Sequence, residues 1–425
     1  MGNSEVTGSN DPLSHTNGLG HKIIATYTLG ERPISEVQNT LFPGSIQNDR
    51  GFFLGGLGSG LWRNPSDPEN EFWMVTDRGP NGKVIVNEQL RRTFPIPEYT
   101  PVLVRVHTGD TDVHIEQVLP LRGSSGKPIL GLSNLEGKDE SPYDFQAETA
   151  LAYNPSGLDP EDLIRTSTGE FWLADEYRPS LVRVSAEGVV LKRFIPQGVE
   201  LPGADYPVAA VLPAIYARRK LNRGFEGLGL SPNQTTLFAV LESPLANPDT
   251  PTSDNSRNTR ILAFDITTER PVAEYVYRFE EVSTFDPAIT QADMKVSGIV
   301  ALPQDALLIL EHTDAVARLY KVDLSRATNI LNTKWADPAT RPSLEMCQDL
   351  SEVEVAALPK SLVIDLTTLP GMPNKIEGLA VVDRQTLAVA NDNDFGIGSF
   401  DQAGNNSGSN VKSQVLIIRL ATPLF

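Results

Sequence analysis

The sequence has a single cysteine, Cys347, among its 425 residues. One thiol cannot form a disulfide within the chain, and it cannot build a cysteine-rich zinc site. The five histidines show neither the HExxH spacing nor any other paired spacing of a zinc site. No apolar run reaches the ~18 residues that a membrane span needs, so we predict that the chain does not span a membrane.

Positive charge is also scarce, with 36 lysines and arginines against 54 aspartates and glutamates and a formal net charge of −18. This excess of acid argues against a nucleic-acid partner or an anionic membrane surface, and it suits a soluble or cation-binding protein. Two common catalytic motifs are missing as well. The glycine-rich stretch at 55–60 lacks the Lys-Ser/Thr of a phosphate-binding loop, and no Gly-x-Ser-x-Gly elbow joins a strand to a helix.

What the sequence does contain is a pattern that recurs five times. In each copy a small or acidic residue opens an apolar strand, a turn follows, and a second apolar strand ends in a carboxylate 14 to 18 residues after the opening residue. Two apolar strands joined by a turn are typical of a β-hairpin. The opening and closing residues are Ser59 and Asp77, Glu161 and Glu176, Glu226 and Glu242, Ser297 and Glu311, and Glu377 and Asp392.

These ten positions should lie on one rim, because the start of the first strand of an antiparallel hairpin lies beside the end of the second. Repeats of this period are usually arranged around an axis. Eight of the ten residues are carboxylates. The pattern therefore predicts an acidic mouth of a central channel, and Ca²⁺, which takes 6–8 oxygen ligands in flexible geometry, is the cation that suits it.

Two further strand-like runs follow most of the hairpins, which predicts an all-β propeller of five four-stranded blades. The last hairpin has only one such run after it, at 414–420, and residues 22–29 can supply the missing strand and close the ring. The stretches 30–54 and 123–156 leave room for a sixth, less regular blade. We expect a flexible segment over residues 1–21 and a single propeller domain over 22–425.

Seven stretches of the sequence carry a resemblance to a known family: 55–62, 76–79, 157–177, 223–228, 310–311, 375–379 and 391–396. They resemble those of the phytase-like domain family, which is described as having the esterase-like activity of phytase. The resemblance implies a β-propeller, usually exported, that hydrolyses phosphoesters or other esters with the help of calcium. On that basis we expect an exported protein whose signal peptide is absent from this chain. One departure is Glu311-His312-Thr313-Asp314, where Glu-Arg-Asp-like residues are expected.

The acidic rim and the resemblance together predict a site. We expect Arg78 or Arg223 to stabilise the negative charge that develops on a phosphate. Glu176 or Glu311 is the leading general base, because crowding by like charges can raise the pKa of a carboxyl group toward the working range. The expected Ca²⁺ ligands are Asp77, Glu161, Glu226, Glu242, Glu377, Asn391 and Asp392.

Three functions remain open from the sequence. The first is a calcium-dependent phosphomonoesterase or phosphodiesterase that acts, as a monomer, on a small-molecule phosphoester. The second is a calcium-dependent lactonase or carboxylesterase, in which the metal polarises a carbonyl group. The third is a non-catalytic propeller that binds a ligand. Any single glutamate before Gly-Leu at a strand start can also be structural, bonded to backbone amides of the neighbouring blade.

Overall fold

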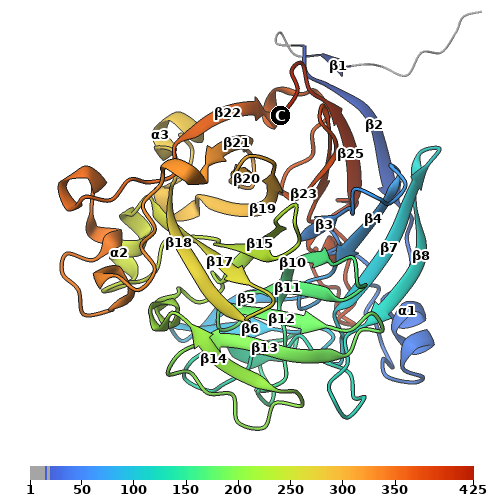
Figure 1. The fold of residues 1–425 in the computed structure, drawn as a ribbon. Coiled ribbons are helices and arrows are strands. Elements are labelled where there is room, and N and C mark those ends of the chain that lie inside the picture. The colour runs from blue at the N-terminus through green and yellow to red at the C-terminus, as the bar shows by residue number, and fades with distance from the viewer. Residues whose placement is uncertain (1–14, 17–19) are drawn as a thin grey trace, which may run out of the picture.

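The computed structural model describes residues 15–16 and 20–425, and β-strands are the dominant regular structure of the described chain (Figure 1). Three sheets each begin with four consecutive antiparallel strands. The first sheet contains β10 (Pro160–Arg165), β11 (Phe171–Asp175), β12 (Ser180–Val184) and β13 (Val190–Pro196), followed by the parallel strand β14 (Val208–Leu212). The second contains β15 (Phe225–Leu230), β16 (Thr236–Leu241), β17 (Asn258–Asp265) and β18 (Arg270–Arg278). The third contains β19 (Lys295–Leu302), β20 (Ala306–His312), β21 (Ala317–Asp323) and β22 (Lys360–Asp365).

A nine-stranded sheet joins the two ends of the described chain. Its order is β23 (Ile376–Asp383), β24 (Thr386–Asn391), β25 (Gln414–Arg419), β2 (Lys22–Leu29), β8 (Asp112–Pro120), β7 (Val102–Gly109), β4 (Glu71–Val75) and β3 (Gly60–Trp62), and β1 (His15–Thr16) pairs with β2. Strand β2 runs antiparallel to β25, with Tyr27 opposite Val415, which confirms the predicted pairing of residues 22–29 with the last strand. The end of β2 also pairs with β8, where Leu29 lies opposite Val113.

The first strands of the repeated hairpins surround a common centre. Strands β3, β10, β15, β19 and β23 contact one another in that cyclic order, and β23 contacts β3. Their backbones come so close that Gly227 leaves no room for a side chain, because a Cβ there would lie 2.0 Å from the carbonyl oxygen of Ser297. In β10 the corresponding residue is Asp162, whose carboxylate accepts a hydrogen bond of 2.8 Å from the backbone amide of Leu228 in β15. This cyclic arrangement confirms a propeller-like all-β fold.

The number of blades stays a prediction, because the nine-stranded sheet holds two of the expected units in one continuous sheet. Neither stretch considered for a sixth blade forms a four-stranded sheet: 30–54 contains helix α1 (Ile34–Leu41), and 123–156 contributes only β9 (Ser141–Tyr143). Most of the predicted flexible segment, residues 1–14 and 17–19, lies outside the described residues. That residues 22–425 form one domain also stays a prediction.

Apolar side chains fill the spaces between neighbouring sheets. Between the first and second sheets, the ring of Trp172 stacks on Phe194 at 5.4 Å, and both rings lie against Phe264. All three side chains are buried. Burial of a large apolar side chain stabilises a fold by roughly 1.5–3 kcal/mol, so these contacts hold adjacent sheets in a fixed orientation. That orientation in turn fixes the residues at the strand ends.

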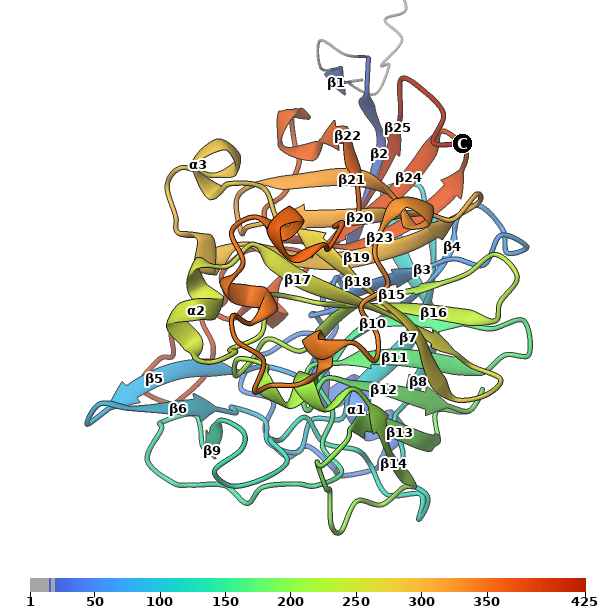
Figure 2. The same ribbon diagram turned by 60° about the vertical axis from the view of Figure 1, so that its left-hand side comes forward.

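Strands β5 (Gly82–Val86) and β6 (Gln89–Thr93) form a hairpin that pairs with β9 in a separate three-stranded sheet. This hairpin projects from the body of the molecule (Figure 2). No helix in the part of the chain that the structure describes is long and apolar enough to cross a membrane. The remaining helices are α2 (Thr250–Asn255), α3 (Val282–Phe285) and the 3₁₀ turns η1 (Ala214–Arg218), η2 (Gln291–Asp293), η3 (Leu324–Arg326), η4 (Lys334–Ala336), η5 (Leu344–Met346), η6 (Leu350–Val353), η7 (Leu366–Thr368) and η8 (Asp394–Gly396).

Candidate functional site

Strand pairing defines three sets of equivalent residues at one end of the five hairpins. In four hairpins the residue after the opening residue pairs with the residue two positions before the closing residue. Gly227, for example, follows the opening Glu226 and pairs with Val240, two positions before the closing Glu242. The closing residue then follows the second strand, and directly after β16 the backbone amide of Glu242 donates to the carbonyl of Gly224 at 3.0 Å. The opening set is Ser59, Glu161, Glu226, Ser297 and Glu377, the closing set is Asp77, Glu176, Glu242, His312 and Asp392, and the set two residues before the openings is Leu57, Asp159, Gly224, Lys295 and Lys375.

The fourth hairpin corrects one sequence prediction. Lys295 pairs with His312, so His312 takes the position that Glu242 holds in the third hairpin. Glu311 is one residue too early, and successive residues of a strand point to opposite faces of a sheet. Its fully buried carboxylate accepts hydrogen bonds from the Tyr277 hydroxyl at 2.5 Å, Lys360 Nζ at 2.8 Å and the backbone amide of Glu280 at 2.7 Å. Glu311 therefore joins β18, β20 and β22, and it is not a candidate base.

Asn391 requires the same correction, because it too precedes the rim position by one residue. Its side-chain amide donates to the carbonyl of Lys412 at 3.1 Å, and its side-chain oxygen accepts from the backbone amide of Gln414 at 2.8 Å. Both ends of the amide are thus used to hold the start of β25. Asn391 therefore lies one residue before the rim position and anchors β25.

Two overlapping groups of carboxylates are the strongest candidate metal site among the described residues. In each group the candidate ligand oxygens lie within 4.8 Å of one another, every member is buried, and Glu176 belongs to both. Oxygen Oε2 of Glu226 and Oε2 of Glu242 are buried without a hydrogen-bond partner. Buried polar atoms are rarely unpaired, and a hard cation would satisfy them, so the residues fit calcium. The groups are Asp159, Glu161 and Glu176, and Glu176, Glu226 and Glu242.

The electrostatics of these carboxylates show an excess of negative charge. Burial raises the pKa of Glu161 and of Glu226 well above the usual value, and the neighbouring carboxylates raise both further. Burial also raises the pKa of Glu176, even though Arg78 opposes it. Glu242 differs: burial alone would raise its pKa, but Arg223 and Lys295 together outweigh burial and lower it. A bound cation would relieve this mutual repulsion.

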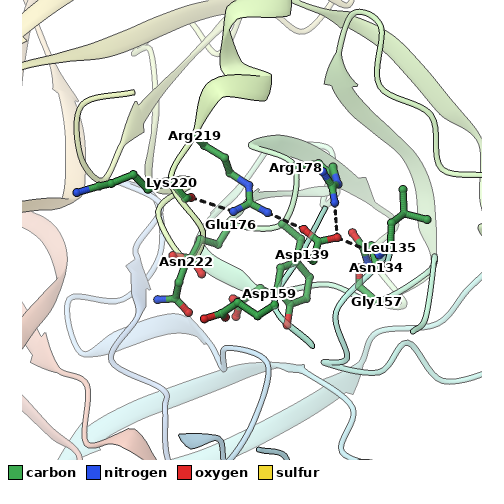
Figure 3. Close-up of polar contacts among 12 residues, drawn as sticks. Asn134, Leu135, Asp139, Gly157, Asp159, Glu176, Arg178, Arg219, Lys220 and Asn222 are labelled. Atoms are coloured by element: carbon green, nitrogen blue, oxygen red, sulfur yellow. Dashed lines mark hydrogen bonds and ion pairs between the residues drawn. The ribbon is translucent and has the colours of Figure 1, made fainter. Parts of the chain in front are cut away.

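Arg78 connects the site to its surroundings instead of facing an open space. Its guanidinium forms ion pairs with Asp159 and, at 2.6 Å, with Glu176, and it donates to the side-chain oxygen of Asn222 at 2.7 Å. The residue is 5% exposed. Asp159, Glu176 and Asn222 come from three separate segments and lie close together (Figure 3). Arg78 therefore fixes the position of two candidate ligands.

A second layer of charged residues surrounds this group. Arg92 donates to both oxygens of Glu140 at 2.8 Å and to Asn222 at 2.6 Å. Nearby, Asp139 lies between Arg178 and Arg219, and its contact with Arg219 is 2.6 Å (Figure 3). Such pairs orient the residues that they bind, and these pairs link the loops around 78–92, 139–140 and 178–222.

Two further cations border the rim. Arg223 bonds to Glu242 through one terminal nitrogen, its side chain is 20% exposed, and no partner of its other two nitrogens is found among the described residues. Lys375 bonds to Asp392 at 2.7 Å and to Asp394 at 2.6 Å. Burial raises the pKa of Glu377 to about 8, although Lys375 opposes this shift. Of the two arginines predicted to stabilise charge on a phosphate, Arg223 is therefore the one whose guanidinium has nitrogens free to donate a hydrogen bond.

The structure therefore brings most predicted residues together. Asp77, Glu161, Glu176, Glu226, Glu242, Glu377 and Asp392 occupy the opening and closing sets, and Arg78 and Arg223 contact them. Sequence analysis missed Asp159, Lys295 and Lys375. A signal for Asp159 was present, because residues two apart on an extended segment lie on the same side, and Asp159 is two residues before Glu161.

Comparison with known proteins gives the family. Residues 53–395 match the Phytase-like family, described as "Esterase-like activity of phytase". The chain belongs to this family. The family indicates a hydrolase. The chain is also 27% identical over 322 residues to an uncharacterized secreted protein of Arthroderma benhamiae, a match that covers 65% of this chain and 62% of that relative. The chain therefore spans less than two thirds of the length of this relative.

Two solved structures are distantly similar to this chain. A luciferin-regenerating enzyme has a TM-score of 0.37 at 10% identity, and the match covers 87% of this chain and 94% of that one. The PQQ-bound aldose sugar dehydrogenase of Streptomyces coelicolor has a TM-score of 0.33 at 11% identity, with 87% and 82% covered. At such scores neither protein informs the function of this chain.

Proposed function

We propose that the chain is a calcium-dependent phosphoester hydrolase, exported like its secreted relative, with its active site on the acidic rim of a five-bladed propeller. One observation carries the proposal: Glu176 is shared by two carboxylate groups, and the Glu226 and Glu242 members of the second leave buried oxygens unpaired. Oxygen ligands at this density suit calcium better than softer metals. The family assignment supports ester hydrolysis as the reaction class.

The proposal divides the acidic residues by role. Asp159, Glu161 and Glu176 would hold one calcium ion, and Glu226 and Glu242 would join Glu176 to hold a second. Bound calcium would act as a Lewis acid that neutralises charge on the phosphate oxygens. Glu176 is then a ligand and not the base, because it takes part in both groups.

Two arginines would support the reaction in different ways. Arg78, which already bonds to Asp159 and Glu176, keeps these carboxylates in position. Arg223 holds Glu242 with one nitrogen and has two further nitrogens free to donate to a phosphate oxygen. A donor aimed at the developing negative charge stabilises the transition state more than the ground state. Arg223 is therefore the proposed catalytic arginine, and Arg78 is a positioning residue.

Glu377 is the proposed proton carrier. Its pKa of about 8 leaves the carboxyl group protonated at neutral pH, and no hydrogen bond to its side chain is found among the described residues. A group of this pKa can give its proton to the oxygen of the leaving alcohol and take one back in the next turnover. This assignment replaces the expected role of Glu377 as a ligand.

The test measures phosphate release from an aryl phosphomonoester and an aryl phosphodiester, with calcium and with a chelator. We expect turnover only with calcium and its loss in Glu176→Gln. The matched control is Glu170→Gln, at the turn end of the same hairpin, where Glu170 bonds to Arg183 on the surface. Turnover that survives chelation, or equal losses in the two variants, would contradict the proposal.

The second candidate is a calcium-dependent lactonase or carboxylesterase. The description of the family as esterase-like favours it, and the same carboxylates could hold a cation that polarises a carbonyl. Hydrolysis of a lactone or an aryl acetate by calcium-loaded protein, with no phosphate release from either phosphoester, would establish this candidate in place of the first.

A further inference from the structure

The β5–β6 hairpin presents an unusual apolar surface. Ile85 is 74% exposed, the highest value among the large hydrophobic side chains that the structure describes, and its direct cross-strand partner Leu90 is 41% exposed. Single exposed apolar residues are ordinary, but a cross-strand pair at the end of a projecting hairpin is a contiguous surface (Figure 2). Leu221, in the loop that supplies Asn222, is 49% exposed.

Strand register places this pair on the same face as residues that border the candidate site. Lys83 pairs with Arg92, and this pair lies two residues along each strand from the Ile85–Leu90 pair. Because residues two apart in a strand point to the same face, all four side chains lie on one face of the hairpin. Arg92 bonds to Glu140 and to Asn222, and Asn222 bonds in turn to Arg78, the partner of Glu176. The apolar pair therefore extends the side of the hairpin that faces the carboxylates.

The other face of the hairpin is different. Val84 pairs with Arg91, whose guanidinium donates to the carbonyl of Ala147 and lies 4.4 Å from the centre of the Tyr143 ring. That face is directed toward β9 and its loop. Val84 is 40% exposed, close to the value for Leu90. Val84 and Leu90 are therefore similarly exposed apolar residues whose side chains lie on opposite faces of the hairpin.

The site-facing surface of the hairpin has a charged part, Lys83, and an apolar part, Ile85 and Leu90. Lys83 is exposed, and no hydrogen-bond or ion-pair partner of its amino group is found among residues 20–425. Two residues along a strand span about 7 Å, so the apolar pair begins that far beyond Lys83. An amphiphilic molecule could place its anionic group toward Lys83 and the rim while its apolar part lies on Ile85 and Leu90.

We propose that Ile85 and Leu90 bind the apolar alcohol part of the substrate, which makes the preferred substrate a phosphoester of an alcohol with a chain or ring of several carbons. This inference rests on the proposed phosphoester hydrolysis. We commit to individual substrate molecules and not to a membrane surface, because a protein with a net charge of −18 is repelled by anionic membranes.

The experiment compares kcat/KM for octyl phosphate and ethyl phosphate, both below the concentration at which octyl phosphate aggregates and both with calcium. The parent should prefer octyl phosphate, and the Ile85→Ser, Leu90→Ser double variant should lower the octyl-to-ethyl ratio about tenfold, within the range that a few methylenes contribute in an apolar pocket. Val84→Ser, on the opposite face, should leave the ratio unchanged. Circular dichroism melting confirms that all variants fold.

Several outcomes would overturn the inference. One is an octyl-to-ethyl ratio near one in the parent, and another is an equal fall of the ratio in Val84→Ser. A preference that appears only with lipid vesicles would assign the hairpin to a surface, and a parent that is dimeric by light scattering while the double variant is monomeric would assign it to an interface between copies. Absence of phosphate release from both substrates would instead contradict the proposed function itself.

Discussion

The two sides of the rim differ in charge although the same hairpin builds both. On the side formed by β10–β11 and β15–β16, here called the acidic side, the equivalent positions hold Asp159, Glu161, Glu176, Glu226 and Glu242. On the side formed by β19–β20 and β23–β24, here called the lysine side, the same positions hold Ser297, His312, Lys295, Lys375, Glu377 and Asp392. The hairpins therefore share one backbone arrangement but place different charged residues at the equivalent positions.

His312 shows how the lysine side avoids a third carboxylate group. It takes the position that Glu176 and Glu242 have on the acidic side, and burial together with Lys295 lowers its pKa to about 3. The imidazole is therefore neutral at working pH and adds no negative charge. Carboxylates repel one another unless a cation lies between them, so a ring of carboxylates at every position would be unstable. The lysine side carries its cations at the repeated positions themselves, whereas the cations that bond to the acidic side, Arg78 and Arg223, lie outside those positions.

The largest effect should come from Glu176→Gln on the acidic side. Loss of a residue shared by both carboxylate groups should weaken calcium binding and lower turnover by more than the roughly 10–100-fold that is typical of residues outside the ligand set. Calcium titration by calorimetry and steady-state rates on the same samples measure both. Asp392→Asn, at the equivalent position on the lysine side, should have a smaller effect on calcium affinity. Equal effects of the two variants would remove the distinction between the sides.

Arg78→Lys should have the next largest effect. A lysine keeps the charge but cannot reproduce the planar contacts to Asp159, Glu176 and Asn222, so both ligands lose their fixed orientation. We expect turnover to fall roughly 10–100-fold, with a calcium affinity that falls in parallel. Arg223→Lys should instead lower turnover more than calcium affinity. A reversed order, with Arg223→Lys losing calcium and Arg78→Lys retaining it, would exchange the two assigned roles.

The sequence predicted the hairpins, their closure by residues 22–29 and the acidic rim, because each depends on local alternation and on residues within one strand or turn. It misplaced Glu311 and Asn391 because a carboxylate or amide near a strand end was identified by its type, whereas its direction depends on the pairing register, which shifts at bulges such as that between Val296 and Ile299. The network of Arg78 with Glu140 and Asn222 was not predictable either, since its partners lie 62 and 144 residues away. The β5–β6 hairpin escaped notice because its exposed apolar residues do not form a core pattern.

Calcium should stabilise the fold through the acidic side. A ligand that binds only the native state adds about 2.7 kcal/mol when its concentration is 100 times the dissociation constant. We therefore expect a higher melting temperature with calcium than with chelator, and a smaller difference in Glu226→Gln. Differential scanning calorimetry measures both. A calcium-dependent shift of equal size in Glu226→Gln and in the parent would show that calcium binds elsewhere.

The last effect, confined to the stability of the protein without calcium, should be a change in the pH dependence of that stability caused by Glu377 on the lysine side. Its folded-state pKa of about 8 lies above the usual value of 4.5, so the folded protein binds this proton more tightly than the unfolded chain does. The resulting stabilisation is fully present below pH 4.5 and is lost as the pH rises toward 8. In Glu377→Gln this contribution is absent, and the free energy of unfolding in chelator should fall less between pH 5 and pH 8 than in the parent.

Urea unfolding at several pH values measures the difference, and Glu170→Gln is the control, since Glu170 is partly exposed and paired with Arg183 on the surface. Parallel pH profiles for the parent and Glu377→Gln would mean that the lysines keep Glu377 ionised, and Glu377 could not then supply a proton at neutral pH.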